Sequence, residues 1–203
     1  MDDFFRFAVA NRVRIVSGFK WFYALLIFVL LVGGRSIYLR DAQFLLVYQW
    51  GVWCGRIAIT LYCITLIPGM MKRFGRTHKL FSLIRIFRRY IGISTFLFAL
   101  THASFVRLII AFPIILDPNS PLFEFFGRLS LFLMFFMFLT SNDFSVNRLR
   151  IWWYRLHWVT HIIMITVLLH TLLQRVSVWS VLIGIIVLLQ LASFIVAFSR
   201  KRS

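Results

Sequence analysis

The chain has 203 residues, of which 61% are hydrophobic, and its net charge of +17 comes from 23 Lys and Arg residues against six acidic ones. This composition is too apolar for a water-soluble domain, which must cover its core with polar side chains. A large basic excess is typical of nucleic-acid-binding proteins, but here the basic residues lie between apolar segments. We therefore expect a membrane protein whose partner is the lipid bilayer, with no nucleic-acid partner.

The first 18 residues place arginines among aromatic and branched side chains, a basic amphipathic pattern typical of a segment lying on the inner leaflet. Six apolar runs follow, each close to the length of about 20 residues that a helix needs to cross a bilayer. They cover approximately residues 19–38, 44–70, 90–112, 122–140, 153–173 and 178–198. We predict an all-α polytopic bundle, with an interfacial segment at 1–18 and a six-helix transmembrane domain at 19–203.

Basic residues divide unequally between the two ends of the predicted spans. The side that holds the N-terminus, the second and fourth connections and the C-terminus carries 17 Lys and Arg residues. The opposite side carries only five, which are Arg35, Arg40, Arg107, Arg128 and Arg175. The positive-inside rule then predicts that both termini are cytoplasmic and that the chain lies in a bacterial inner membrane. Cys54 and Cys63 are nine residues apart in one run, on opposite sides of a helix, so we predict no disulfide between them.

Four of the five histidines lie in the predicted spans: His102 in the third, and His157, His161 and His170 in the fifth. Ionisable side chains inside a membrane are candidates for function, because leaving them without partners in hydrocarbon is costly. His78 differs, since it lies in the basic second connection, and we interpret it as a solvated loop residue.

The depth of each histidine selects a candidate pair, because two axial ligands of one haem must lie at the same level on neighbouring helices. The third span is predicted to start near Tyr90, so His102 lies 12 residues in, a rise of ~18 Å. The 13 residues from His157 to His170 in the fifth span give a rise of ~20 Å. His102 and His170 are thus expected to bind one haem b together, the alternative being two core histidines bonded to nearby hydroxyl or backbone oxygens.

His157 lies near the predicted cytoplasmic end of the fifth span, where a second haem would need a partner on the third span. Arg88 precedes His102 by 14 residues, which places it ~21 Å lower on the same helix face. Arginine does not ligate iron, but it binds a haem propionate or a flavin phosphate. Thirteen residues leave a helix about 140° out of register, so His157 and His170 require a helix irregularity, different faces or different roles.

Two further residues are candidates for the same chemistry. His161 shares the face of His157 within about 40°, as an alternative inner ligand, a proton carrier or a core histidine. Arg56 is a single charge inside the second span, which favours a functional partner such as a propionate or a quinone oxygen over packing alone.

Several short motifs occur together between residues 44 and 175. They are Leu83-Ile84-Arg85 with Arg88-Arg89-Tyr90-Ile91-Gly92 and His102, then Leu139-Thr140-Ser141, then Trp153-x-x-Leu156-His157 with His170, and more weakly Gly55-Arg56 and Ile64-Thr65. In these motifs and their joint spacing the chain resembles the YedZ/MsrQ family, the haem-binding membrane subunits of the periplasmic methionine sulfoxide reductase system, within the ferric-reductase-like transmembrane superfamily.

The resemblance implies ligand roles for individual residues. In that family the third-span histidine and the later fifth-span histidine ligate haem, which corresponds to His102 and His170 here, and the earlier fifth-span histidine, here His157, is implicated in an inner site. The related NADPH oxidases and ferric reductases have a second third-span histidine where this chain has Arg88. The resemblance therefore implies one haem b or two.

The resemblance also implies a function, electron transfer through haem b to a periplasmic acceptor, a molybdopterin methionine sulfoxide reductase. The cytosolic flavin and nucleotide domains of the superfamily are not in this sequence, so the expected donor is a cytoplasmic flavin reductase, a bound FMN or quinol. One alternative is a ferric-chelate or quinone reductase in its own right. Another is a haem-free transporter or scaffold, but the inverted repeats or broken mid-membrane helices expected of a transporter are not evident.

Overall fold

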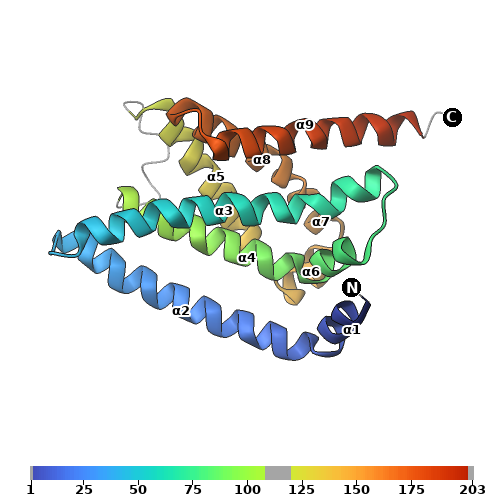
Figure 1. Ribbon diagram of the computed structural model, residues 1–203, viewed down its shortest axis with the longest axis horizontal. Helices are drawn as coiled ribbons and strands as arrows, with labels where there is room; N and C mark the ends of the chain where they lie inside the picture. Colours follow the sequence, from blue (N-terminus) through green and yellow to red (C-terminus); the bar gives the residue numbers. More distant parts are fainter. Residues whose placement is uncertain (1, 108–119, 201–203) are drawn as a thin grey trace. The chain divides into compact units, whose positions relative to one another are not determined.

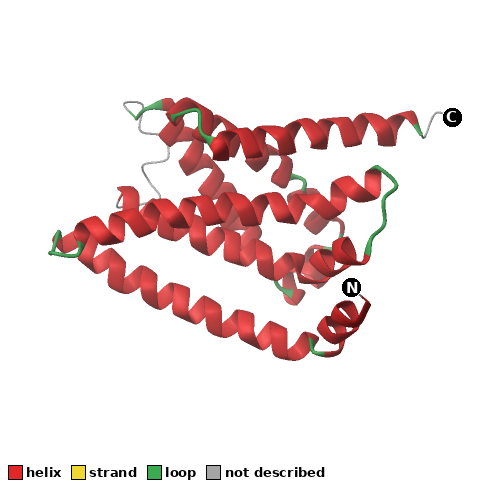
Figure 2. Ribbon diagram, in the orientation of Figure 1, coloured by secondary structure: helices red, strands yellow, loops and turns green. Residues whose placement is uncertain are grey.

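The computed structural model describes residues 2–107 and 120–200, and all regular secondary structure in these residues is helical (Figures 1 and 2). This confirms the predicted all-α class. The helices are α1 (Asp2–Ala10), α2 (Arg12–Leu39), α3 (Phe44–Arg73), α4 (Lys79–Arg107), α5 (Leu122–Leu139), α6 (Asp143–Leu149), α7 (Ile151–His157), α8 (Val159–Gln174) and α9 (Val178–Ser199). They form two compact units: α1 to α4 with the C-terminal half of α9, and α5 to α8 with its N-terminal half.

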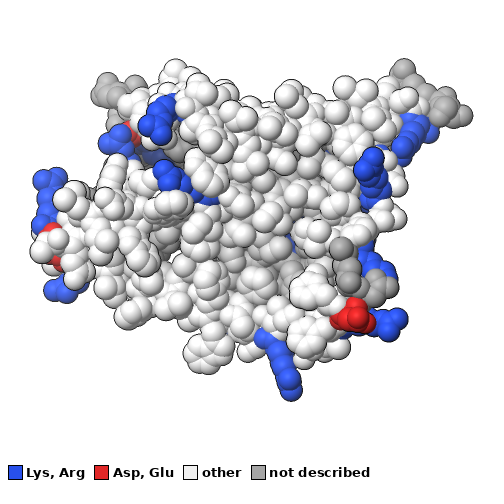
Figure 3. All heavy atoms as spheres, viewed as in Figure 1, with Lys and Arg blue, Asp and Glu red and all other residues white. Residues whose placement is uncertain are grey.

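Five described segments are long and apolar enough to cross a membrane: α2, α3, α5, α7 with α8, and α9. The outer surface of α2 shows that these helices expose large apolar side chains, which is unfavourable in water. Trp21, Leu25, Phe28 and Leu31 follow one another at helical spacing with exposed fractions of 77%, 57%, 62% and 68%. On the face shown in Figure 3, Lys and Arg gather near helix ends and leave the lengths between them uncharged. The chain is therefore a multi-pass membrane protein.

Among the described residues, the third of the six predicted spans is the one that does not meet the length and hydropathy expected of a membrane-crossing helix. Residues 90–107 belong to α4, but Ser94, Thr95, Thr101 and His102 reduce the mean hydropathy of the helix, and several arginines precede them. Residues 108–112, which complete the predicted span, lie outside the described part of the chain. The count of six spans thus stays a prediction.

In the predicted interfacial segment, residues 2–18 are helical, with a break at Asn11 between α1 and α2. The Asn11 side-chain amide donates to the carbonyl of Phe7 at 2.9 Å. α1 packs on α4, with Ala8 3% exposed while Phe4 and Phe7 are 61% and 63% exposed. The second helix starts at Arg12, seven residues before the predicted span, because nothing in residues 12–18 interrupts helical hydrogen bonding.

The predicted fifth span is two consecutive helices, α7 and α8, that meet at Trp158. The backbone N–H of Trp158 donates to Arg155 O at 3.1 Å and that of His161 donates to Trp158 O at 3.0 Å. Bonds of this i to i−3 spacing tighten the turn relative to an α-helix. The structure therefore contains a helix irregularity between His157 and His170, one of the three possibilities that their spacing left open.

Close helix contact in the first unit depends on glycines. Phe105 of α4 is 2% exposed and packs against Gly33 of α2 and Gly51 of α3. A Cβ at Gly51 would lie 2.6 Å from Phe105 Cβ, and one at Gly33 would overlap the Phe105 ring. Small residues allow helices to approach closely where there is little hydrophobic drive between them. Cys54 and Cys63 are buried and their thiols are free.

Phe105→Ala is expected to destabilise the first unit, because it empties the space between α2, α3 and α4. Large-to-small changes of a buried Phe cost about 3 to 5 kcal/mol. Reversible unfolding of the purified protein in mixed micelles measures the change. Phe28→Ala is the control, since Phe28 is 62% exposed, and equal losses for both variants would contradict this packing.

The second unit is built on contact between α5 and α8. Ser130 Oγ donates to Thr166 Oγ1 at 2.7 Å, and Thr166 Oγ1 donates to Ile163 O at 3.0 Å. All three residues are buried, with Ile163 0% exposed. The Trp153 indole N–H donates to Thr140 O at 3.0 Å and ties α7 to the end of α5. This contact holds the face of α8 that carries His170 against α5.

Candidate functional site

His102 lies on α4, with its ring against the adjoining helix α3. Its Nδ1 atom is 2.9 Å from the carbonyl oxygen of Gly51. A Cβ placed on Gly55, one turn further along α3, would lie 2.7 Å from the same Nδ1. The ring is thus seated at a point on α3 where no side chain larger than hydrogen fits.

His170 lies on α8 in the second unit, in the same arrangement with α5. Its Nδ1 atom is 2.6 Å from the carbonyl oxygen of Phe123. A Cβ placed on Gly127 would again lie 2.7 Å from Nδ1. Two histidines on different helices therefore have the same two partners: a main-chain carbonyl and, four residues later, a glycine.

This bond determines which ring nitrogen carries the proton. A main-chain carbonyl oxygen only accepts hydrogen bonds, so Nδ1 of His102 and of His170 must be the donor. In a neutral imidazole the lone pair then belongs to Nε2. Metal-ligating histidines usually donate their other ring N–H to a carbonyl or carboxylate, which orients the ring and raises the basicity of the ligand. Both rings are held in the tautomer that ligation through Nε2 needs.

The local sequence explains how a helical carbonyl accepts this second bond. Residues four apart in a helix lie on the same face, one turn above each other. Without a side chain at Gly55 or Gly127, a ring from the neighbouring helix approaches the carbonyl one turn earlier. The two segments read Gly51-Val-Trp-Cys-Gly55-Arg56 and Phe123-Glu-Phe-Phe-Gly127-Arg128, with arginine after the glycine in each.

His157 and His161 have a different environment. His157 Nδ1 is 2.9 Å from Trp153 O in its own helix, and its ring stacks on the Trp153 indole at 3.7 Å between centroids. His161 Nδ1 is 3.1 Å from Trp158 O, also a local contact. Their rings are held by residues three or four positions earlier, so these bonds tie neither histidine to a neighbouring helix.

The candidate arginines are distributed over both units. The guanidinium of Arg56 lies 4.5 Å from the centre of the Trp53 ring, so it has an aromatic partner within α3. Arg88 is an exposed residue of α4 in the first unit, whereas His157 belongs to the second. Arg128, which was not among the predicted site residues, is partly buried on α5: its side chain is 10% exposed and lies 3.8 Å from Glu124.

Sequence reasoning identified the two histidines of this arrangement but not Gly51, Phe123 and Gly127, and it used Gly55 only for the weaker part of the family resemblance. The sequence offers no specific signal for them. The pair Gly-Arg occurs at 34–35, 55–56, 75–76 and 127–128, and a Cβ at Gly34 would meet nothing within 4 Å, so the pair by itself does not indicate a close approach.

Within residues 2–107 and 120–200, no three His, Cys, Asp or Glu side chains come together as a metal site. Axial ligation of haem by two histidines needs no such group. Comparison with family models, curated proteins and solved structures finds no match. The functional proposal below depends on the residues of this chain and on the resemblance of its motifs.

Proposed function

We propose that this protein is a b-type haem protein that transfers electrons across the inner membrane, with His102 and His170 as the axial ligands. The observation that carries the proposal is the arrangement that these two histidines share. Each donates from Nδ1 to a carbonyl on the neighbouring helix, beside a glycine that leaves no room for a side chain. In this proposal α4 is the third of six spans, and both termini are cytoplasmic.

The residues around the two rings suit a haem. When bound, haem supplies a one-electron redox centre, and the chain supplies ligands, an apolar surround and countercharges for the propionates. Arg56 and Arg128 each follow one of the two glycines, and arginine binds carboxylates through a planar fork of donors. Thr101 and Thr171, next to the two histidines, bond to carbonyls of their own helices, at Leu97 O and Val167 O. The two threonine hydroxyls therefore bond within their own helices, whereas each histidine Nδ1 bonds to a carbonyl of the neighbouring helix.

The proposed electron path runs from a cytoplasmic flavin donor or membrane quinol to a periplasmic acceptor. The resemblance in the sequence supports a methionine sulfoxide reductase as that acceptor. The basic second connection and the exposed Arg88 are the part of the chain that suits a flavin phosphate or an anionic redox partner.

A difference spectrum tests the proposal directly. The protein is purified in detergent from cells supplied with haem precursor, and the spectrum of the dithionite-reduced sample is compared with that of the oxidised one. We expect the α-band of a haem b with two nitrogen ligands. Preparations that fold, as judged by size-exclusion chromatography, but show no such band would overturn the proposal.

We further expect one haem per chain. The inner site lacks a second histidine on α4, since Arg88 holds that position and arginine does not ligate iron. His157 is stacked on Trp153 and bonded to its own helix. Pyridine haemochrome analysis with a protein assay on the same sample gives the ratio, and a ratio of two would show that His157 has a partner elsewhere.

A further inference from the structure

The turn between α3 and α4 has a fixed geometry. Gly75 has a φ of 75°, in the left-handed region that favours glycine. Its N–H donates to Lys72 O at 3.1 Å, and the N–H of Arg76 donates to Met71 O at 2.9 Å. This pair of bonds is the Schellman pattern that ends a helix at a glycine. The bonds fix where α3 ends and the direction in which the chain leaves it.

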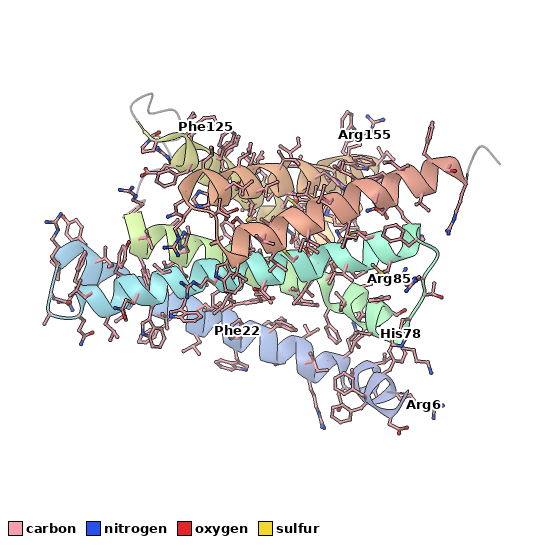
Figure 4. The ribbon with its side chains drawn as sticks, turned by 45° about the horizontal axis from the view of Figure 1, so that its top comes forward. Arg6, Phe22, His78, Arg85, Phe125 and Arg155 are labelled. Carbon is pink, nitrogen blue, oxygen red and sulfur yellow. The ribbon has the colours of Figure 1, made fainter. Side chains whose placement is uncertain are left out.

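A hollow of about 530 Å³ lies at this turn, lined by Met71, Gly75, Arg76, Thr77, His78 and Phe81. Figure 4 shows His78 at the beginning of α4, with Arg85 further along the same helix. His78 Nδ1 accepts the N–H of Leu80 at 3.3 Å, so the neutral ring carries its proton on Nε2 as a donor. The lining thus combines two apolar side chains with donors from a guanidinium, a hydroxyl and an imidazole.

The sequence around this hollow is strongly basic, and the acidic residues on an element that packs against α4 are Asp2 and Asp3 at the start of α1. No acidic residue occurs between Asp41 and Asp117, while seven Lys and Arg residues occur between positions 72 and 89. Arg200 adds another cation, because its guanidinium donates to Arg73 O at 3.4 Å and to Phe74 O at 3.2 Å. Within the described residues the Arg76 side chain has no ion pair or hydrogen bond. Cations this close together raise the free energy unless an anion joins them.

We propose that this hollow binds the phosphate headgroup of an anionic phospholipid. Arg76, Thr77 and His78 supply donors for the phosphate, and Met71 and Phe81 supply apolar contact for the start of an acyl chain. The site goes beyond the proposed haem function and does not depend on it.

The position of the hollow favours a lipid over a phosphate compound from solution. α3 changes from apolar to basic between Met71 and Lys72, and such a change is typical of the level where headgroups meet hydrocarbon. α1 packs on α4 nearby, and Phe4, Phe5, Lys79, Leu80 and Leu83 together line a second, small depression. An apolar surface with basic residues at its edge is typical of segments that recognise anionic leaflets.

Native mass spectrometry of the full chain in neutral detergent tests the proposal, since it counts bound lipids. The protein is titrated with phosphatidylglycerol, with phosphatidylcholine and with inorganic phosphate in separate series. We expect phosphatidylglycerol to bind more tightly than phosphatidylcholine. Arg76→Gln should weaken phosphatidylglycerol binding about fivefold, as expected for the loss of one basic contact to the headgroup.

Arg85→Gln is the matched control, because it removes one charge from the same helix end but outside the lining of the hollow. It should leave the first lipid bound with an affinity changed by less than about twofold. His78→Gln provides a second variant within the hollow and should also weaken binding. Equal effects of Arg76→Gln and Arg85→Gln, equal binding of the two lipids, or displacement of the lipid by equimolar inorganic phosphate would each overturn the proposal.

Discussion

Replacing His102 or His170 with alanine is expected to abolish the haem b spectrum of the purified protein. An axial ligand contributes more than the groups that orient it, and loss of an orienting partner alone costs 10- to 100-fold in metal affinity, so we expect a loss beyond about a hundredfold. In each histidine the Nδ1 atom donates to a carbonyl oxygen, Gly51 O for His102 and Phe123 O for His170, and Nε2 keeps the lone pair. Each alanine variant removes that Nε2 lone pair. The measurement is the haem to protein ratio with the reduced-minus-oxidised spectrum.

Two control experiments distinguish the loss of an iron ligand from general damage to the protein. His161→Ala should retain haem, because its ring is bonded to the carbonyl of Trp158 in its own helix turn. His102→Gly and His170→Gly should recover a haem b band when imidazole is added, since the added ring replaces the missing nitrogen donor. Normal spectra in both alanine variants would reject the ligand assignment. Loss of folded protein is recognised by size-exclusion chromatography and separated from loss of haem.

The fold class was predictable because a strongly apolar composition leaves few alternatives. Long runs of Leu, Ile, Val and Phe fix where helices occur, and the predicted run at 122–140 agrees with α5 (Leu122–Leu139). Helix ends were less predictable, because they depend on backbone bonds rather than on hydropathy. α2 begins at Arg12 despite its basic residues, and the interruption at Trp158 has no glycine or proline to announce it.

The site was only partly predictable, for a related reason. Depth along a helix follows from residue counting, and it selected His102 and His170 from five histidines. The acceptors are main-chain carbonyls, and every residue has one, so a sequence gives no direct sign of which carbonyl a ring will approach. The roles of Phe123 and Gly127 follow only from the contact between α5 and α8 in the structure. Arg128 was counted with the charges of the less basic side of the membrane, whereas it lies within α5 and its side chain is only 10% exposed.

Replacing Gly55 or Gly127 with alanine is expected to weaken haem binding while leaving the helices intact. In each variant the new methyl group would lie 2.7 Å from the histidine Nδ1, closer than real Cβ atoms approach such an atom. The ring must shift away, and its bond to the carbonyl lengthens or breaks. Because this bond orients the ligand, we expect a loss of affinity of about 10- to 100-fold. Haem titration of apoprotein, followed by absorbance, measures it.

Helix propensity makes this prediction distinguishable from general damage. Alanine favours a helix over glycine by about 1 kcal/mol, so a variant that only altered the helix would be as stable as the parent or more so. Gly34→Ala is the matched control, since a Cβ there meets nothing within 4 Å. It should bind haem normally. If Gly55→Ala and Gly127→Ala bind haem as tightly as Gly34→Ala, the carbonyl bonds do not position the ligands. If they lose haem and keep the parent's thermal stability as apoprotein, the shared glycine serves the histidine rather than the helix.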